Sequence, residues 1–528
     1  MRIVSSHIMA EIDRKSQEDF SIPGMILMED AALKAFQRLR DIRETDPEAP
    51  PFLDLFFVCV VGGGNNAGDA LVMARQALIA GIRNIRVIIR NRKANELAAI
   101  HLSIVESLGI PVISWDEDRK SAEDTIRSAD VIIDGIAGTG MKGALRGTAA
   151  EMVRYINTEG RGYIVAVDIP SGLGMDYEAG FPAVKADLTI SMGLPKIPLY
   201  TPLGRRLCGE IELVNPGFPP KLLEQPEGSG LMIIPQREIA WSDYLLASAD
   251  KALYKNSRGH AGVFAGREGT TGAAVLAAES AARSGVGLVT LYCDSDVYPI
   301  IAHQCRSVMV RRLPEANGPA PLSELLAGKH SALLAGPGWG SAGREELLEE
   351  LLASGLPGVL DADGIRVLKN LRDRKGTDFV SKKTAGRWVL TPHPGEFLYL
   401  AEGSSADCTK DQLLAGPLDP MRRISAELQT VIVLKSNVVW ITAPDGDYAV
   451  IDGMNPALGT GGAGDVLAGI TAAFLARGGG AFQSSVAAAA FHQRLGYIAA
   501  RRTGWFLAED LPGYISEVLG GSADFAKK

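Results

Sequence analysis

The sequence NPALGTGGAGDVLAG, residues 455–469, is the stretch around which the rest of the chain is best interpreted. Its glycines at 459, 461, 462 and 464 let the backbone adopt positive φ angles and approach a ligand without obstruction from side chains. An apolar helical pattern follows directly, so several backbone N–H groups and the positive end of the helix dipole would point at one place. The stretch therefore predicts a phosphate-binding loop at the start of a buried helix.

Asp465 ends this loop and falls on the first turn of the expected helix, where the helix dipole favours the ionised carboxylate. Beside a bound phosphoryl donor, such a carboxylate can take the proton of an attacking hydroxyl. The alternative is a glycine-rich turn capped by an aspartate that binds no ligand. So dense a glycine pattern favours a phosphoryl-transfer site with Asp465 as its catalytic base.

The composition is that of an ordinary globular protein, with 528 residues of which 46% are hydrophobic and 22% charged. This length exceeds what one hydrophobic core usually serves, so we expect two or three domains. A net charge of −8 argues against general binding to nucleic acids or anionic membranes. The five cysteines lack metal-ligand spacing, and neither a signal-peptide pattern nor a membrane-spanning apolar run is present. We expect a cytoplasmic protein with reduced, buried thiols.

The first half of the chain alternates between apolar strand patterns and helical patterns after two initial helices. This alternation predicts an α/β fold in which a doubly wound, Rossmann-like parallel sheet has helices on both faces. The expected helices are 8–19, 25–40, 68–81, 95–109 and 121–129, and the expected strands are 52–61, 85–90, 111–114, 131–135 and 163–170.

Three polar clusters follow strands of this expected sheet. They are the run GGGNNAGD at 62–69, Asp134 with the glycines of 138–140, and DIPSG at 168–172. Because the carboxyl ends of parallel strands line one crevice, we expect these clusters to converge on one ligand. Any one of them alone could be a tight turn with a helix N-cap.

Gly62, Gly64 and Ala67 also satisfy the loose dinucleotide fingerprint GxGxxA, which raises the possibility of an NAD(P)-dependent oxidoreductase. The next strand counts against it, because basic residues at 90–93 stand where an acid would bind the ribose.

A cation site is a further possibility at the same strand ends. Asn66, Asp134 and Ser171 together offer an amide, a carboxylate and a hydroxyl oxygen, which are ligands that hard cations prefer.

The second half resumes the α/β alternation after a stretch at 215–230 that is rich in proline and glycine and reads as an interdomain connection. A helix of small residues at 271–285 is expected to pack closely against its neighbours. Two apolar runs flank the turn residues 444–447 and predict a β-hairpin that leads into the glycine-rich loop. The expected strands lie within 259–266, 286–293, 331–340, 358–364 and 387–397, with a further helix at 344–355.

Three polar residues of this half are candidates for ligand contacts or for packing. His393 lies between two prolines in a loop, which favours contact with a ligand over burial in a core. His492 lies in an alanine-rich helical pattern and is expected to pack. Lys435 ends an apolar strand and would steady phosphate charge, unless it is simply an exposed lysine at the start of a hairpin.

The motifs of the first half resemble the NAD(P)HX epimerase domain of the NAD(P)H-hydrate repair enzymes. They are GGGNNAGDALV (62–72), DGIAGTG (134–140), DIPSG (168–172) and ADLTISMGLPK (186–196), with alanine at 67 and 70 where the family mostly has glycine. The resemblance implies an epimerase domain over 1–222, Asp168 as the proton-transfer group, and K⁺ bound by Asn66, Asp134 and Ser171. It implies that the hydrated nucleotide contacts Asn65, Asn66, Ala67, Gly68, Asp69, Gly138, Thr139, Gly140, Met141, Lys142, Gly143, Ala144 and Asp168.

The motifs of the second half resemble the ribokinase-like ADP-dependent NAD(P)HX dehydratases. They are GTTGAA (269–274), GPGWG (336–340), LDADG (360–364), TPHPGE (391–396), VLKSN (433–437) and GGAGDVLAG (461–469). The resemblance implies a ribokinase-like domain over 228–528 in which the hydrated nucleotide contacts Ala273, Gly338, His393, Pro394, Gly395, Glu396, Phe397, Leu398, Tyr399 and Asp465. ADP is implied to contact Lys435, Ser436, Asn437, Val438, Val439, Asn455, Pro456, Ala457, Leu458, Gly459, Thr460, Gly461, Gly462, Ala463 and Gly464.

The two resemblances together imply a bifunctional enzyme of metabolite repair. One domain would interconvert the R and S epimers of hydrated NAD(P)H, and the other would use ADP as phosphoryl donor, with Mg²⁺, to dehydrate the S epimer to NAD(P)H with release of AMP and phosphate. The implied partners are NADHX, NADPHX and ADP or ATP, in a homo-oligomer that binds neither nucleic acid nor membrane.

Another enzyme class fits the same residues less completely. It is a small-molecule kinase of the ribokinase class, whose N-terminal domain would be a nucleotide-binding regulatory module without turnover. A stable phosphoester product would support the kinase, whereas phosphate release with regained NADH absorbance would support the dehydratase.

Overall fold

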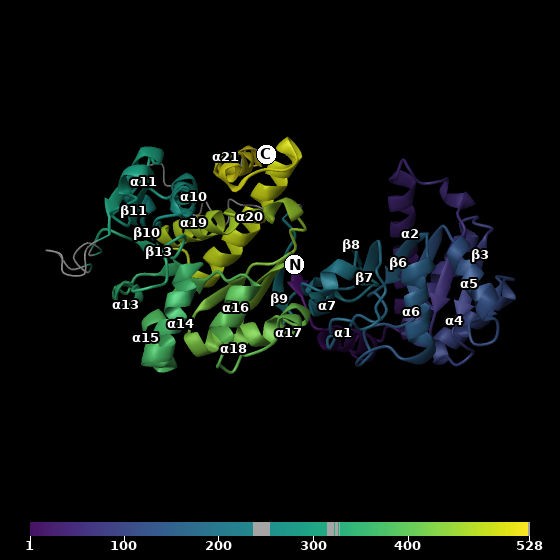
Figure 1. Ribbon diagram of the computed structural model, residues 1–528. Coiled ribbons are helices and arrows are strands. Elements are labelled where there is room, and N and C mark those ends of the chain that lie inside the picture. Colours follow the sequence, from purple (N-terminus) through teal and green to yellow (C-terminus); the bar gives the residue numbers. More distant parts are fainter. Residues whose placement is uncertain (236–253, 314–321, 323–325, 327, 526–528) are drawn as a thin grey trace. The chain divides into compact units, whose positions relative to one another are not determined.

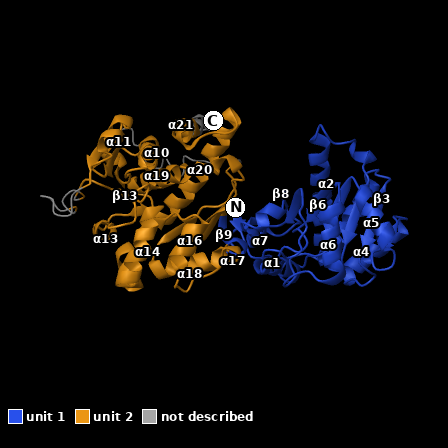
Figure 2. Cartoon of the chain, viewed as in Figure 1, with its two compact units in different colours: residues 1–231, 414–416 blue, residues 232–413, 417–528 orange. Residues whose placement is uncertain are grey.

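The computed structural model describes residues 1–235, 254–313, 322, 326 and 328–525, so parts of the expected 228–528 domain lie outside the described residues. The chain divides into two compact units (Figure 2). Unit 1 contains residues 1–231 and 414–416, and unit 2 contains residues 232–413 and 417–528. Each is an α/β structure built on a largely parallel sheet, as expected from the sequence (Figure 1). None of the described helices is long and apolar enough to cross a membrane.

The sheet of unit 1 has seven parallel strands in the order β4-β3-β2-β5-β6-β7-β8. The chain runs outward from β2 to β4 and then returns to β5, so the winding direction reverses between β2 and β5. Ligands of doubly wound sheets bind at the carboxyl ends of the strands at such a point. The strands are β2 (Phe57–Val61), β3 (Ile85–Ile89), β4 (Val112–Ser114), β5 (Val131–Gly135), β6 (Tyr163–Val167), β7 (Leu188–Met192) and β8 (Glu210–Val214).

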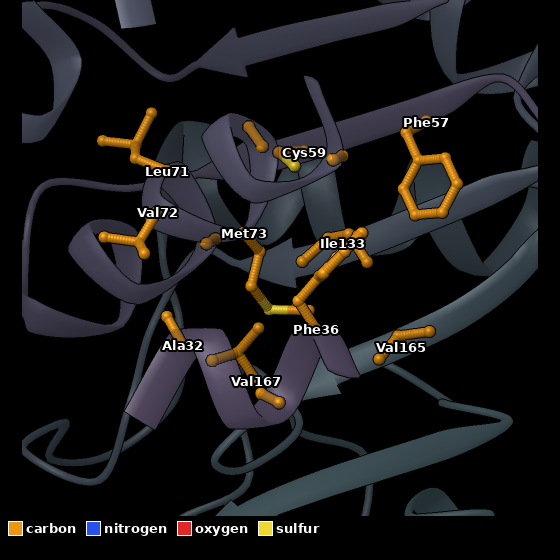
Figure 3. Packing of buried hydrophobic residues seen from close by; sticks show 14 of the residues in the cluster. Ala32, Phe36, Phe57, Cys59, Leu71, Val72, Met73, Ile133, Val165 and Val167 are labelled. Atoms are coloured by element: carbon orange, nitrogen blue, oxygen red, sulfur yellow. The ribbon is translucent and has the colours of Figure 1, made fainter. Parts of the chain in front are cut away.

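Helices cover both faces of this sheet and form a hydrophobic core on each. Successive side chains of a strand point to opposite faces, so alternate residues of β2 belong to different cores. Cys59 belongs to one core with residues of α2 and α3, and Val58 belongs to the other. Figure 3 shows the first core, where Phe36 of α2 and Met73 of α3 lie near Ile133 of β5. The helices are α1 (Ser6–Glu18), α2 (Gly24–Thr45), α3 (Asn65–Ile79), α4 (Glu96–Ser107), α5 (Arg119–Ser128), α6 (Gly147–Glu159), α7 (Ile197–Tyr200) and α8 (Pro220–Leu223).

Several expected boundaries in unit 1 were wrong. The strand expected at 52–61 begins only at Phe57, because residues 52–54 form a 3₁₀ turn after Pro51. The strand expected at 163–170 ends at Val167, because Asp168 adopts a left-handed conformation with φ of 65°. The connection expected at 215–230 contains helix α8 and the first residue of strand β9 (Gly230–Ile233), which pairs with β1 (Arg2–Ile3).

The sheet of unit 2 contains the neighbouring strands β12-β11-β10-β13-β14-β15-β16-β17-β18. Pairing is parallel from β12 to β16 and antiparallel from β16 to β18. The hairpin expected around 444–447 joins β17 to β18, and a second turn at 435–438 divides the preceding apolar run into β16 and β17. The strands are β10 (His260–Phe264), β11 (Leu288–Cys293), β12 (Met309–Arg312), β13 (Ala332–Ala335), β14 (Gly358–Leu360), β15 (Trp388–Leu390), β16 (Val431–Leu434), β17 (Val439–Thr442) and β18 (Tyr448–Ile451).

Two helices of small residues, α10 and α19, pack with their backbones close together. A Cβ atom built on Gly469 of α19 would lie 2.2 Å from the carbonyl oxygen of Ala277 in α10, so glycine is needed for this approach. This confirms the close packing expected from the small residues at 271–285. The helices after β9 are α10 (Thr271–Arg283), α11 (Tyr298–Gln304), α13 (Glu345–Ala353), α14 (Asp363–Lys375), α15 (Thr377–Thr384), α16 (Pro394–Ala401), α17 (Lys410–Ala415), α18 (Leu418–Leu428), α19 (Ala463–Ala476), α20 (Ala481–Thr503) and α21 (Leu511–Phe525).

Candidate functional sites

The three residues expected to form a cation site in unit 1 meet around the backbone of Ala137. Ser171 donates its hydroxyl to Asp134 Oδ1 at 2.6 Å and its backbone N–H to Oδ2 at 2.8 Å. Asn66 Nδ2 donates to the carbonyl oxygen of Ala137 at 3.1 Å, and the Ala137 N–H donates to Ser171 Oγ at 2.8 Å. The strand ends therefore bring an amide, a carboxylate and a hydroxyl to one place.

Asp134 carries the charge of this cluster. Its side chain is fully buried at the end of β5, and burial raises its pKa to about 6 although Ser171 and the Ile136 N–H hydrogen bond to it. Among the described residues, no Lys, Arg or His side chain forms an ion pair with Asp134. A buried carboxylate without a cationic partner is costly, and a bound monovalent cation would remove that cost.

Asp168 follows β6 directly and forms a buried ion pair. Its Oδ1 accepts hydrogen bonds from Lys196 Nζ at 2.6 Å and from the Met192 N–H at 2.9 Å. The Lys196 side chain is 1% exposed, and its ammonium group also donates to Ser191 Oγ and to the Met192 carbonyl oxygen. All three N–H donors of the Lys196 ammonium group are therefore used in hydrogen bonds to Asp168 and to the two residues that end β7.

A cavity of about 740 Å³ opens beside these residues, within the range of small-molecule and cofactor sites. Its wall is formed by α1, α2, the start of α3 and the ends of β5, β6 and β7. Eight of the residues expected to contact the nucleotide line it, namely Asn65, Asn66, Asp69, Gly138, Thr139, Gly140, Met141 and Asp168.

The other five expected nucleotide contacts, Ala67, Gly68, Lys142, Gly143 and Ala144, are not part of the cavity wall, and their roles stay predictions. The methyl groups of Ala67 and Ala70 lie in the hydrophobic core and do not narrow the cavity. A Cβ on Gly68 would lie 2.5 Å from the sulfur of Met28, so this glycine serves the contact of α3 with α2.

Two further carboxyl groups line the cavity. Asp69 is 8% exposed, and burial raises its pKa well above the usual range; the charges of Asp168 and Asp13 add to this effect and Lys196 opposes it. Burial also raises the pKa of Asp13 on α1, whereas a hydrogen bond from Gln17 at 3.3 Å lowers it. The cavity thus has three carboxyl groups and a single lysine on its wall.

In unit 2, the glycine-rich loop opens α19 as the sequence predicted. Gly462 has φ of 94° immediately before the helix, which a residue with a side chain rarely adopts. Asn455 starts the loop, with its Oδ1 accepting from the Ala457 N–H at 3.1 Å. The position of Gly464 would bring a Cβ within 3.1 Å of Lys435 Nζ, so the missing side chain leaves room for this ammonium group.

Lys435 is held at the loop by a buried partner. Its Nζ lies 2.6 Å from Asp361 Oδ1, and Thr391 donates its hydroxyl to the same oxygen at 2.7 Å. Asp361 follows β14 directly and is 2% exposed. The alternative of an exposed lysine at the start of a hairpin is therefore wrong.

Asp465 lies in the first turn of α19 beside this pair. Burial and the negative charges of Asp361 and Glu396 together raise its pKa to about 7, against the opposing charge of Lys435. The helix dipole favours the ionised form, but burial and the two neighbouring carboxylates outweigh it. A carboxyl group with this pKa exchanges its proton near neutral pH.

The two histidines singled out in the sequence have different surroundings. His393 is the N-cap of α16: its Nδ1 accepts from the N–H groups of Gly395 and Glu396, and its own N–H donates to Glu396 Oε2 at 2.9 Å. Its ring is 55% exposed, so it remains accessible to a ligand, and its predicted contact stays a prediction. His492 is buried in α20, where burial lowers its pKa to about 4, and it packs as expected.

The remaining expected dehydratase residues lie in three groups. Ala273, in the first turn of α10, and Gly338 are brought together through Thr270, whose hydroxyl donates to the Gly338 carbonyl oxygen at 2.8 Å. The first turns of α16 hold Pro394 and Gly395, whereas Phe397 is fully buried and Tyr399 donates its hydroxyl to Asn370 of α14. The segment from Lys435 to Val439 forms the turn before β17, and Val438 and Val439 are buried.

Two residues at these sites were not recognised as candidates from the sequence. Lys196 and Asp361 stand within quoted motifs, but their importance depends on partners that are 28 and 74 residues away. The available signal was their position at the ends of apolar strands, with Asp361 directly after β14 and Lys196 four residues after β7. Within the described part of the chain, no group of three or more His, Cys, Asp or Glu side chains is placed to hold a metal ion.

Two family models match the chain. The model described as YjeF-related protein N-terminus matches residues 24–197, and the model described as NAD(P)H-hydrate dehydratase matches residues 261–517. The two matches fall in the first and second halves of the sequence, in the order expected from the motifs.

Similar proteins extend over nearly the whole chain. The bifunctional NAD(P)H-hydrate repair enzyme of Moorella thermoacetica is 31% identical, with 98% of this chain and 97% of that protein covered. The enzyme of the same name from Archaeoglobus fulgidus is 30% identical, with 98% and 99% covered. Among solved structures, the ADP/ATP-dependent NAD(P)H-hydrate dehydratase of Bacillus subtilis, co-crystallized with ATP and Mg²⁺, is 25% identical over 52% of this chain and 94% of its own, with a TM-score of 0.43.

The raised pKa of Asp465 predicts a pH-dependent cost in stability. Between its usual pKa of 3.8 and about 7, the folded chain holds a proton that the unfolded chain releases, so stability falls as pH rises through this window. Asp465→Asn removes the cost and should raise the free energy of unfolding at pH 8 by up to about 4 kcal/mol, with a smaller gain at pH 5. Urea unfolding at both pH values measures the difference.

Asp378→Asn is the matched control, because Asp378 also lies in a helix first turn but is exposed. Loss of its interaction with the helix dipole should cost about 0.3–1 kcal/mol at pH 8, which is the opposite sign. An Asp465→Asn chain that is equally or less stable than wild type at pH 8 would contradict the assignment.

Proposed function

The chain belongs to the bifunctional NAD(P)H-hydrate repair enzyme family, and we propose that it repairs hydrated NAD(P)H through two activities on separate parts of the chain. Residues 1–222 interconvert the R and S epimers of NADHX and NADPHX. Residues 228–528 dehydrate the S epimer with ADP as phosphoryl donor and release NAD(P)H, AMP and phosphate. The observation that carries the proposal is Asp465, half-buried beside Lys435 at the glycine-rich start of α19.

Dehydration needs a better leaving group than hydroxide at C6 of the nicotinamide ring. Asp465 takes the proton of the C6 hydroxyl as the hydroxyl oxygen attacks the terminal phosphorus of ADP, and the bond to the AMP oxygen breaks. The lone pair of the ring nitrogen then expels phosphate from C6. Loss of a C5 proton restores the dihydropyridine ring. A base with a pKa of about 7 suits this proton transfer at neutral pH.

The donor's negative charge is bound by the glycine-rich loop and Lys435. The N–H groups at the start of α19 face a phosphate, and the Asp361 carboxylate holds the ammonium group of Lys435 in place. The residues proposed to contact ADP are those of 435–439 and 455–464, and those proposed to contact the hydrated nucleotide are Ala273, Gly338, 393–399 and Asp465. Mg²⁺ bound to the donor's phosphates would neutralise charge that develops during the transfer.

The epimerase activity supplies the configuration that the dehydratase accepts. Asp168 assists reversible loss and return of water at C6 in the cavity of unit 1, and Asn65 to Asp69 with Gly138 to Ala144 hold the nucleotide. Asn66, Asp134 and Ser171 hold K⁺, a proposal supported by the buried carboxylate of Asp134, which has no cationic partner among the described residues.

The rival class, a ribokinase-type kinase with a regulatory N-terminal module, is not favoured. Such a kinase would explain the glycine-rich loop, but it would leave the match to repair enzymes across 98% of the chain unexplained. The homo-oligomeric state and the cytoplasmic location expected from the sequence belong to the same proposal.

Asp465→Asn should abolish most of the dehydratase activity while leaving the epimerase activity of the same chain intact. Loss of a general base typically lowers the rate on the order of 100-fold to 10,000-fold. ADP-dependent recovery of NADH absorbance from S-NADHX measures the first activity, and chromatography of the two epimers measures the second. The wild-type rate should rise with pH up to about 7 as Asp465 loses its proton. Undiminished nucleotide-dependent repair by the variant would refute the role of Asp465.

Potassium should stabilise the chain through Asp134. The unfolding temperature of the wild type should be higher in KCl than in choline chloride at the same ionic strength, because only K⁺ can pair with the buried carboxylate. In Asp134→Asn this difference should vanish. A wild-type chain that unfolds at the same temperature in both salts would argue against the cation site, whatever its catalytic activity.

A further inference from the structure

We propose that the epimerase site transfers protons with two carboxyl groups, Asp69 as the acid and Asp168 as the base, and that Lys196 is the positioning residue for Asp168. The inference rests on the epimerase function proposed for unit 1 and adds two residues to its chemistry. It follows from the hydrogen bonds and the burial of the side chains that line one cavity.

Asp168 is the member of the pair that is held by a cation. The ammonium group of Lys196 lies 2.6 Å from its Oδ1, and the Met192 N–H donates to the same oxygen. Lys196 is fixed in turn by Ser191 and by the Met192 carbonyl oxygen, both on β7. Both contacts end on Oδ1, so Oδ2 of Asp168 is available to the cavity that Asp168 lines.

Asp69 is the protonated member. It lies one turn into α3 at 8% exposure and lines the same cavity, and its side chain forms no hydrogen bond or ion pair with the described residues. Burial and the charges of Asp168 and Asp13 raise its pKa well above the usual range, against the opposing charge of Lys196. The charged groups of α2 and α4 near α3 lie further along that helix, where Glu29 pairs with Arg75 and lies 3.8 Å from His101.

Asp13 is the competing candidate for the acid, because it also lines the cavity from α1. It differs from Asp69 in its contacts: Gln17 donates a hydrogen bond to it at 3.3 Å, which favours the ionised form. Asp69 has no such donor. Asp69 and Asp168 are therefore the two neighbouring carboxyl groups whose surroundings differ most: burial without a donor favours the protonated form of Asp69, and Lys196 pairs with Asp168. Such a difference lets one carboxyl group act as the acid and the other as the base at neutral pH.

The proposed step balances without any reactant other than water. The C6–O bond breaks as the Asp69 proton passes to the departing hydroxyl, which leaves as water, and the lone pair of the ring nitrogen forms a C=N bond. A water then adds to the other face of C6, the C=N electron pair returns to nitrogen, and the Asp168 carboxylate takes the proton. The opposite epimer reacts by the same steps in reverse, and water in the cavity returns the proton between turnovers.

Epimerisation by full-length variants over a range of pH tests the proposal. The wild-type kcat/KM should fall at high pH as Asp69 loses its proton. Asp69→Asn should be slower on the order of 100-fold and should lack the high-pH fall. Asp13→Asn is the matched control and should keep the high-pH fall. The dehydratase activity of each variant on S-NADHX reports that the chain is folded.

Lys196 is tested by a pair of substitutions. Lys196→Met should lower epimerase activity and move the high-pH fall to still higher pH, because the charge of Lys196 opposes the rise in the pKa of Asp69. Lys196→Arg should restore part of the rate and of the profile. A purely structural role would not move the pH profile.

The outcomes separate the inference from the function on which it rests. A wild-type chain that interconverts the epimers no faster than the spontaneous rate would overturn the epimerase function itself. A wild-type chain that is active, with an Asp69→Asn variant that keeps its rate and high-pH fall, would overturn the inference alone. Loss of the high-pH fall in Asp13→Asn would also overturn it, by making Asp13 the acid.

Discussion

The ion pair between Lys435 and Asp361 leaves the neighbouring Asp465 without a cation of its own. Asp465 lies in the first turn of the glycine-rich helix α19, and Asp361 lies beside it. The ammonium group of Lys435, 2.6 Å from Asp361, has to balance the charge of both carboxyl groups and of any bound phosphate. Burial then makes the ionised form of Asp465 costly. This shortage of positive charge lowers the stability of the fold. It also raises the pKa of Asp465, so that this side chain can act as a base near neutral pH, and it leaves the loop able to bind an anion together with its metal ion.

Unit 1 obeys the same constraint with different residues. Lys196 pairs with Asp168, while Asp69 and Asp13 face the cavity and form no ion pair with the described residues, and Asp134 is buried at the neighbouring strand end. Parallel sheets explain why the charges gather there, since the carboxyl ends of all strands meet at one edge. Each unit thus holds one carboxylate with a lysine and leaves another carboxyl group to exchange protons or to pair with a ligand.

The sequence predicted the α/β class, the order of most elements and the convergence of Asn66, Asp134 and Ser171, because each of these depends on local pattern and on the rule for parallel strands. It could not reveal that Lys196 reaches Asp168, since that contact depends on β7 pairing with β6. It could not reveal the raised pKa of Asp465 either, because the burial of this side chain and the charges of Asp361 and Glu396 depend on segments far apart in the chain.

The central claim is that one chain converts both epimers of hydrated NAD(P)H to NAD(P)H and consumes ADP in the dehydration. Incubating the full-length chain with a mixture of R-NADHX and S-NADHX and with ADP tests it most directly. The account predicts complete recovery of NADH from both epimers, faster than they interconvert spontaneously, with one AMP and one phosphate for each NADH. A stable phosphorylated product without NADH absorbance would contradict it.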